Sequence, residues 1–409
     1  MSTAGNAVRT LPLPELGLRF WVLLFVCAQA ALQLPYLVLV PGERTNLFTP
    51  ALTLLSLAVF WREAGGAAAW RFWVPWLAVG AGLALVSALS PVPGPSLLRA
   101  FAFWAPAIAG LMCGRAFCGD SQRLRAFFWL LTACFAAVVA ANLLLGRSPE
   151  FLGLHHHALT GVFVLLSAGP IWLTWTGSGL QRWASITLLA VGYMLCFLAG
   201  SRFLVLLPAV LLPLLMTLRR VRLRYALAWT SLALVAGWQF FALNPEKIPR
   251  YINYESTFYR LEGIPASLEI LRQHPLAGIG MRAPRVELLR NYEPSFGMVD
   301  KDTFLTVVSR NVTADNQYLS LPVGIGIPLA LLYFILLGRE LWRMAVRARR
   351  SELSQAVQWA LFLPVAATLI QLTIYDGLFY PQVCWFLHLL AGAGTAEPAT
   401  QGQGGGHGV

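Results

Sequence analysis

Arg202 is the first residue of this chain whose type and position suggest chemistry. It follows Gly200 and Ser201 between two long apolar runs. A guanidinium group binds phosphate oxygens through two parallel N–H donors, so an arginine in this place could hold a phosphorylated substrate at the membrane surface. The alternative is an interfacial arginine that only extends its charged end toward lipid headgroups. Because ionisable groups at membrane spans are candidates for function, we favour substrate binding.

Asp315 and Asn316 stand where a long polar stretch ends and an apolar run begins. Asp and Asn are both favoured N-cap residues, since their side-chain oxygens accept hydrogen bonds from the free backbone N–H groups of a first helical turn. A carboxylate at the membrane surface can instead act as a general base when burial adjusts its pKa. From the spacing alone, capping is the favoured interpretation.

Arg260 lies in the sequence Tyr259-Arg260-Leu261-Glu262. The ordinary interpretation is a solvated arginine on a helix face, paired with Glu255 or Glu262. As a catalytic candidate it has no advantage, from the residues alone, over the other arginines of the same polar stretch, which are Arg250, Arg272, Arg282, Arg285, Arg290 and Arg310.

Three consecutive histidines, His155, His156 and His157, precede another apolar run. Neighbouring side chains point in different directions on a helix, so these imidazoles cannot build a metal site by themselves. One of them could donate a hydrogen bond to a phosphate, although surface polarity is the favoured interpretation. Asp300 and Asp302 form Asp-Lys-Asp, which we interpret as a loop feature. We therefore expect neither a metal nor another cofactor.

The composition is that of an integral membrane protein. Of the 409 residues, 57 % are hydrophobic and only 12 % are charged, whereas soluble domains carry roughly 25 % charged residues. The six cysteines fall mostly in apolar runs without metal-ligand spacing, which predicts small core residues and no disulfide framework.

An all-α polytopic fold follows from the lengths of the apolar runs. A span needs about 20 apolar residues, and the sequence accommodates about twelve such spans. Nine fall within residues 1–243 and three within 317–394, while 395–409 form a Gly-rich tail that we expect to be disordered. The expected spans are 18–40, 46–61, 73–90, 98–117, 126–146, 157–175, 183–200, 202–218, 225–243, 317–338, 355–375 and 377–394.

The arginines predict the orientation of these spans. Clusters at 219–224 and 339–350 fall in connections on one side, whereas the connections on the other side contain few cations. Under the positive-inside rule the rich side is cytoplasmic, with both termini. Residues 244–316, here called the cap segment, then lie outside the cytoplasm. This distribution accounts for most of the net charge of +12, so no nucleic-acid partner is implied.

The cap segment has a helical pattern of its own. Leu261, Ile264, Leu268 and Leu271 recur at three- and four-residue spacing, which predicts one apolar helix face. Pro265 favours a helix start, so we expect a break at residues 263–264. A turn should follow over 274–280, then loops over 282–312 with a short helix at 283–291. We expect a small helical cap on the outer membrane surface.

The order of these motifs resembles that of the O-antigen ligase and O-antigen polymerase family of bacterial membrane glycosyltransferases. The resemblance rests on Gly200-Ser201-Arg202, on Arg260, on His274-Pro-Leu-Ala-Gly-Ile-Gly280, on Asp315-Asn316-Gln317-Tyr318-Leu319, and on Gly324 and Gly326. It covers roughly residues 155–340, and it implies an architecture of the GT-C type in the inner membrane, with the active site on the periplasmic side. The processes implied are lipopolysaccharide or exopolysaccharide biosynthesis of the cell envelope.

The resemblance also implies roles for residues. Arg202 and Arg260 match arginines that handle the diphosphate of an undecaprenyl-diphosphate-linked glycan, and Asp315 would be the base. Asn316, Tyr318 and His155–His157 would contact substrate. The acceptor would be a glycan or lipid A-core. The reaction would invert the anomeric centre without a metal, and membrane lipids would surround the protein. The ligases of this family look as if they carry a His-Asn pair where this chain has Asp315-Asn316. The resemblance therefore leaves both a ligase and a polymerase function open.

Two other functions compete with glycosyl transfer. A transporter or flippase for a polar anion or lipid-linked sugar suits twelve spans, but the sequence has no internal repeat of the kind common in such proteins. A membrane scaffold without chemistry leaves Arg202 unexplained.

Overall fold

The structure is a computed structural model of the chain. It describes residues 37–40, 43–45, 67–117, 121–145, 156–198, 254–283, 285–295, 297, 300–310, 315–350 and 352–395. Arg202, His155 and the expected spans at 46–61, 202–218 and 225–243 lie outside these residues.

The described chain is almost entirely helical, as the sequence predicts. The helices are α3 (Ala67–Ala88), α4 (Pro93–Phe117), α5 (Ser121–Leu145), α6 (His156–Leu166), α7 (Ala168–Thr176), α8 (Gly179–Leu198), α12 (Tyr254–Gln273), α13 (Lys301–Arg310), α14 (Gln317–Ile325), α15 (Ile327–Arg350), α16 (Glu352–Gln371), the 3-10 helix η4 (Gly377–Phe379) and α17 (Pro381–Thr395). The expected helical span 18–40 is wrong at its end, because residues 37–40 form strand β1 (Leu37–Val40), which pairs antiparallel with β2 (Glu43–Thr45).

Within the described chain, three helical stretches are long and apolar enough to cross a bilayer: Trp70–Ala88, Pro93–Ala116 and Arg123–Leu144. They correspond to three of the expected spans. Shorter apolar helices cover Thr160–Thr176 and Ala356–Gln371. The total of about twelve spans stays a prediction.

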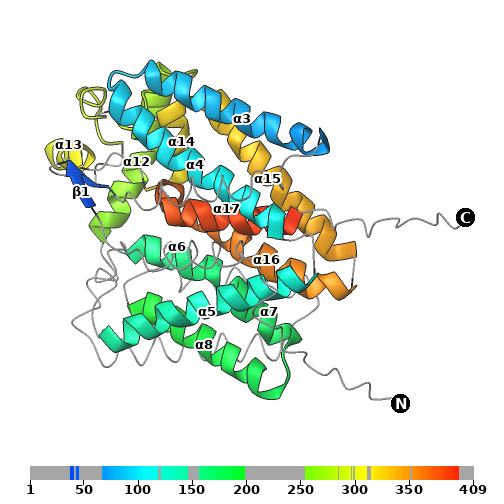
Figure 1. Cartoon of the computed structure of the whole chain (residues 1–409). Coiled ribbons are helices and arrows are strands. Elements are labelled where there is room, and N and C mark those ends of the chain that lie inside the picture. The colour runs from blue at the N-terminus through cyan, green and yellow to red at the C-terminus, as the bar shows by residue number, and fades with distance from the viewer. Residues whose placement is uncertain are drawn as a thin grey trace, which may run out of the picture.

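Helix α17 lies at the centre of the bundle and contacts α4, α15, α16 and α6 (Figure 1). Gly110 and Gly114 of α4 permit the closest approach, since a Cβ on Gly114 would lie 2.1 Å from the carbonyl oxygen of Leu389. Small residues allow membrane helices to pack backbone against backbone in this way. The four described cysteines are buried and unbridged, which confirms their interpretation as core residues.

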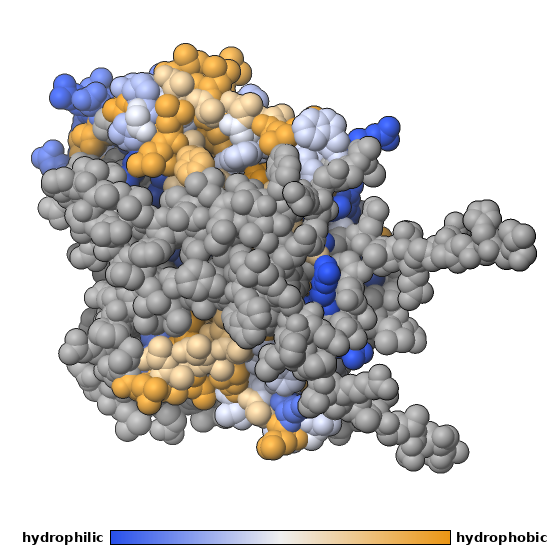
Figure 2. All heavy atoms as spheres, viewed as in Figure 1, coloured by the Kyte–Doolittle hydropathy of each residue, from blue (hydrophilic) through white to orange (hydrophobic). Residues whose placement is uncertain are grey.

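The molecule has two polar ends with an apolar zone between them. In Figure 2 hydrophilic residues gather at the left, near the cap helices α12 and α13 of Figure 1, and again at the right, where α15 ends. Large apolar side chains stay exposed between these ends, including Leu85 at 62 % and Ile335 at 63 %. An exposed apolar band between polar ends is the surface expected of a membrane protein.

The cap segment differs from its expected form in three places. Helix α12 continues through Pro265 without the expected break at residues 263–264. The expected helix at 283–291 consists of turns, whereas residues 301–310, expected to be a loop, form α13. Asp300 explains the latter, because its carboxylate accepts a hydrogen bond from the Thr303 N–H at 2.9 Å and caps the helix.

The apolar face of α12 is also turned differently from the expected arrangement. Leu261, Ile264 and Leu268 are 43 %, 39 % and 53 % exposed, whereas the fourth residue of the expected face, Leu271, is buried, as are Glu262 and Ile270. Three of the four expected stripe residues therefore point away from the protein, and only Leu271 packs into it. An exposed apolar stripe next to an apolar band favours contact with lipid.

The motif at 274–280 joins the cap segment to helices α14 and α15. The N–H groups of Ile279 and Gly280 donate to the carbonyl oxygens of Val323 and Gly324, both at 2.9 Å, and Ile327 N–H donates to Pro275 O at 2.9 Å. Through these bonds, the backbone of the cap segment pairs with the backbone polar groups at the break between α14 and α15. The same bonds position α12, which carries Arg260, against α14, which begins two residues after Asp315.

Gly326 is the residue on which this junction depends most. Its backbone has φ 82° and ψ 158°, a conformation that is almost exclusive to glycine. A Cβ there would lie 2.0 Å from the carbonyl oxygen of Leu276. We expect Gly326→Ala to lower stability by about 1–3 kcal/mol or more, measured by thermal unfolding in detergent.

Gly338 provides the matched control within the same helix pair. Nothing lies within 4 Å of the Cβ that Gly338→Ala would add. Ala in a helix interior is favoured over Gly by roughly 0.5–1 kcal/mol, so this variant should be as stable as the wild type or more so. Equal stability of Gly326→Ala and the wild type would contradict the proposed role of the junction.

Candidate active site

Arg260 and Asp315 form an ion pair where α12 of the cap segment meets the start of α14. Arg260 Nε of α12 lies 3.4 Å from Asp315 Oδ2, just before α14. The side chains are 27 % and 46 % exposed, so a solute can reach both groups. The structure thus distinguishes Arg260 from the other arginines of the cap segment by placing it beside the candidate base.

Asn316, and not Asp315, is the N-cap of α14. Its side-chain oxygen accepts a hydrogen bond from Tyr318 N–H at 3.0 Å. The favoured interpretation of Asp315 as the cap is therefore wrong. With Asn316 performing this task, the Asp315 carboxylate faces Arg260.

The backbone of Asp315 is held in an uncommon conformation. Its φ of 50° makes it the non-glycine residue with positive φ in the described chain. Such conformations persist where the surrounding structure determines them, and they cluster at functional sites. Here the left-handed turn aims the carboxylate toward α12 while the next residue already caps the helix.

Gln317 and Tyr318 fix the start of α14 to the connection between α16 and α17. The buried Gln317 side-chain oxygen accepts from Leu378 N–H at 3.0 Å, and the backbone N–H of Gln317 donates to Leu372 O at 2.9 Å. The Tyr318 hydroxyl donates to Leu369 O at 2.7 Å. Asp315 is thereby presented from a rigid base, and the Tyr318 hydroxyl already has a protein partner.

A second pair of opposite charges lies behind the first. Asp376, buried at the start of η4, accepts a hydrogen bond from Ser320 Oγ of α14 at 3.1 Å. Arg285 of the cap segment is also buried and interacts electrostatically with Asp376. Tyr375 lies within electrostatic range of both Asp315 and Asp376. These contacts bring residues 260, 285, 315, 375 and 376 into one cluster.

The charge state of Arg285 follows from this environment. Burial lowers the pKa of its guanidinium to about 10, and the neighbouring Asp376 acts in the opposite direction. The group is still protonated at neutral pH. The site therefore contains two cations and two carboxylates, held by three separate parts of the chain.

The sequence pointed less clearly to some members of this cluster. Asp376 was not among the predicted site residues, although Tyr375-Asp376-Gly377 between two apolar runs is a signal of the same kind as Arg202. Arg285 was only one of several equivalent arginines. His156 and His157 begin α6. No group of three His, Cys, Asp or Glu within the described ranges has the geometry of a metal site.

Comparison with known proteins finds a family similarity over part of the chain. The family model described as O-antigen ligase matches residues 186–334, which contain Arg202, Arg260, the 274–280 turn and Asp315. No curated protein matches the chain. The family match and the apolar helices indicate a membrane protein of the O-antigen ligase or polymerase type, with glycosyltransferase-like activity on lipid-linked glycans. Residues 186–334 are thus similar to the O-antigen ligase family.

Proposed function

We propose that the chain transfers a glycan from undecaprenyl diphosphate to a hydroxyl group of an acceptor sugar. The observation that carries the proposal is the accessible Arg260–Asp315 pair at the junction of the cap segment and the membrane helices. It puts a group that can bind diphosphate next to a group that can accept a proton.

In the proposed reaction the Asp315 carboxylate takes the proton from the acceptor hydroxyl. The hydroxyl oxygen then attacks the anomeric carbon of the donor, and the bond from that carbon to the phosphate oxygen breaks. The bonding electrons stay on the diphosphate, where Arg260 and Arg202 stabilise the developing charge. Direct displacement inverts the anomeric centre. The chemistry assigned to these residues requires no metal.

In the proposed reaction, both residues of the ion pair change their interaction partners when the donor binds. In the structure Arg260 neutralises Asp315 across 3.4 Å. A bound diphosphate offers Arg260 two phosphate groups, which match its planar fork better than one carboxylate oxygen does. Donor binding would then draw Arg260 away from Asp315 and leave the carboxylate available to the acceptor.

The exposed stripe on α12 supports a lipid-linked donor. Arg260, Ile264 and Leu268 are spaced four residues apart, so they lie on one side of the helix with Leu261 beside them. Ile264 and Leu268 are both more than a third exposed. A polyprenyl tail could follow this stripe while its diphosphate contacts Arg260, whereas a soluble sugar nucleotide would gain nothing from it.

Asn316, Tyr318 and His155–His157 are the remaining residues that we propose to contact substrate. The Asn316 oxygen and the Tyr318 hydroxyl have protein partners, so their contribution would come from the amide nitrogen and the ring. The acceptor is either a growing glycan or lipid A-core. Asp315 in place of histidine favours a polymerase of O-antigen or exopolysaccharide.

The sidedness of the donor distinguishes transfer from flipping. In cells that lack this protein, we expect the undecaprenyl-linked glycan to accumulate in the outer leaflet of the inner membrane, because the missing step follows translocation. Digestion of intact spheroplasts with an impermeant glycosidase measures this. Accumulation in the inner leaflet, protected from the enzyme, would instead support the flippase alternative.

We propose the inner membrane as the location, with the cap segment in the periplasm. Ser295 is an exposed residue of that segment, and Ser178 is an exposed residue between α7 and α8. We expect an impermeant thiol reagent to label Ser295→Cys in whole cells and to label Ser178→Cys only after the membrane is opened. The reverse pattern would overturn the orientation.

A further inference from the structure

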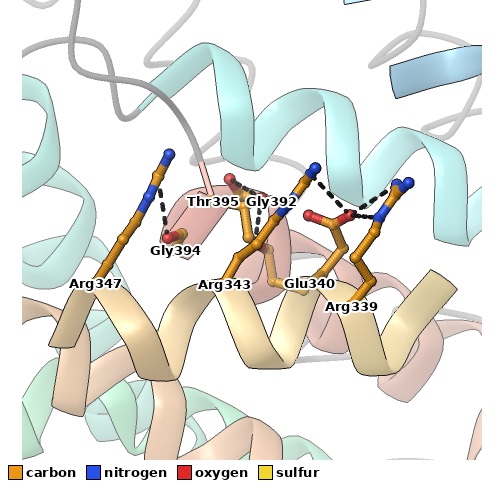
Figure 3. A network of polar contacts seen from close by, with 8 residues as sticks. Arg339, Glu340, Arg343, Arg347, Gly392, Gly394 and Thr395 are labelled. Carbon is orange, nitrogen blue, oxygen red and sulfur yellow. Dashed lines mark hydrogen bonds and ion pairs between the residues drawn. The ribbon is translucent and has the colours of Figure 1, made fainter. Parts of the chain in front are cut away.

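The end of α15 carries a cluster of arginines that the proposed transfer reaction does not use. Residues 339–350 contain five arginines and one glutamate. Arg339, Arg343 and Arg347 are spaced four residues apart, so they form one stripe along the helix. Figure 3 shows all three projecting from the same face of α15 toward the end of α17. Like charges at this spacing repel one another, so the arrangement requires compensation.

Glu340 supplies part of this compensation from inside the protein. Its side chain is fully buried, and its Oε1 accepts from Arg339 Nε at 3.0 Å and from Arg343 Nη1 at 3.4 Å (Figure 3). Arg347 Nη1 donates to the carbonyl oxygen of Gly394, at the negative end of α17. One carboxylate oxygen thus serves two guanidinium groups, and one positive charge is left over between these three residues.

Arg339 and Arg343 are held by protein contacts and are still accessible. Arg339 lies over the ring of Phe72 at 5.9 Å, and Arg115 of α4 lies over the same ring at 4.1 Å. The side chains of Arg339 and Arg343 are 33 % and 46 % exposed. An arginine that only extends toward the headgroups has no need of a buried carboxylate or a shared ring, so this geometry indicates a preformed binding site.

The cluster lies at the end of the apolar zone opposite to the candidate active site. With a rise of about 1.5 Å per residue, Arg339, Arg343 and Arg347 are about 18, 24 and 30 Å along α15 from Ile327 at the cap junction. The hydrocarbon core of a bilayer is also about 30 Å thick. Trp342 in the same stretch is 67 % exposed, as expected of a side chain at the membrane interface.

We propose that Arg339 and Arg343 bind the headgroup phosphate of an anionic phospholipid at this end of α15. The phosphate would complete the charge balance that Glu340 begins, and the acyl chains would lie along the exposed Leu331 and Ile335 of the same helix. Basic sites between membrane helices are suited to such headgroups.

The test uses the purified full chain in a neutral detergent, with thermal unfolding as the readout. A ligand that binds the folded state raises the unfolding midpoint. We expect phosphatidylglycerol to raise it, and phosphatidylcholine and inorganic phosphate at the same concentration to leave it unchanged. Added salt should weaken the effect. An equal effect of phosphatidylcholine would overturn a charge-based site, and an equal effect of inorganic phosphate would overturn a lipid as the ligand.

A triple variant links the effect to these residues. Arg339→Gln, Glu340→Gln and Arg343→Gln together remove the buried carboxylate with its partners, so that no uncompensated charge is left in the interior. Arg125→Gln, at an exposed residue of α5, changes the net charge by the same amount. The triple variant should bind phosphatidylglycerol at least about tenfold more weakly, and the control should bind like the wild type. Wild-type binding by the triple variant would contradict the site.

Discussion

Asp315→Asn should lower the rate of glycan transfer by roughly 10²–10⁴-fold, the range typical for loss of a general base. The change replaces one carboxylate oxygen with an amide nitrogen and preserves the shape of the side chain. Asn316 caps α14 in either case, and Asn tolerates the φ of 50° at this position at least as well as Asp. Turnover measured with saturating donor and acceptor reports the loss.

The same variant separates a base from a residue that only holds Arg260. If Asp315 merely fixed the arginine, Asp315→Asn would weaken donor binding. If it is the base, donor affinity should be unchanged or slightly higher, because Arg260 no longer has a competing carboxylate. The loss of a pair this exposed costs at most about 1 kcal/mol of stability. Asp302→Asn, at an exposed acid in α13, controls for the change in charge.

An Asp315→His variant adds a second comparison. It creates the His-Asn pair that the resemblance associates with ligases, and histidine is among the side chains enriched at positive φ. We expect this variant to recover part of the lost activity. Activity of Asp315→Asn close to that of the wild type would remove Asp315 as the base and direct attention to His155–His157.

Arg260→Lys should reduce transfer by roughly 100-fold, similar to the loss of one donor that stabilises transition-state charge. Lysine keeps the charge but offers a single ammonium group, which cannot make the two-pronged contact with a diphosphate. The same loss is expected for Arg202→Lys if both arginines bind that group. Turnover and donor affinity should be measured together, and at normal protein levels.

Arg272→Lys provides the control for Arg260→Lys. Arg272 is an exposed residue in the last turn of the same helix α12, twelve residues after Arg260. This variant should transfer glycan at the wild-type rate. Near-full activity of Arg260→Lys, or an equal loss in Arg272→Lys, would contradict a specific role for Arg260 at the diphosphate.

The sequence predicted the helical character of the chain and three of its candidate spans, because both depend on local patterns. Apolar run length identifies spans such as Trp70–Ala88, and glycines at 278 and 326 mark backbone conformations that other residues avoid. The expected span 317–338 was less accurate. It is divided at Gly326 into α14 and α15, and α15 continues through the arginines to Arg350.

The cluster at the candidate active site could be found only from the tertiary structure. Arg260 and Arg285 are equivalent to the other arginines of the cap segment in the sequence, and only the packing of α12 on α14 brings Arg260 to Asp315. Asp376 comes from a distant connection and joins the cluster through Ser320. The sequence also could not predict which way the apolar stripe of α12 faces, because periodicity identifies a helix face but not what that face contacts.

The most direct test of the proposed function is transfer by the purified protein. The donor is the undecaprenyl-linked glycan extracted from cells that lack this protein, and the reaction is run with the acceptor glycan or lipid A-core in the presence of a chelator. We predict that the wild type forms the transferred product and releases undecaprenyl diphosphate, while Asp315→Asn binds the donor with little turnover. Donor left intact by folded wild-type protein, or equal turnover by both proteins, would contradict the proposal.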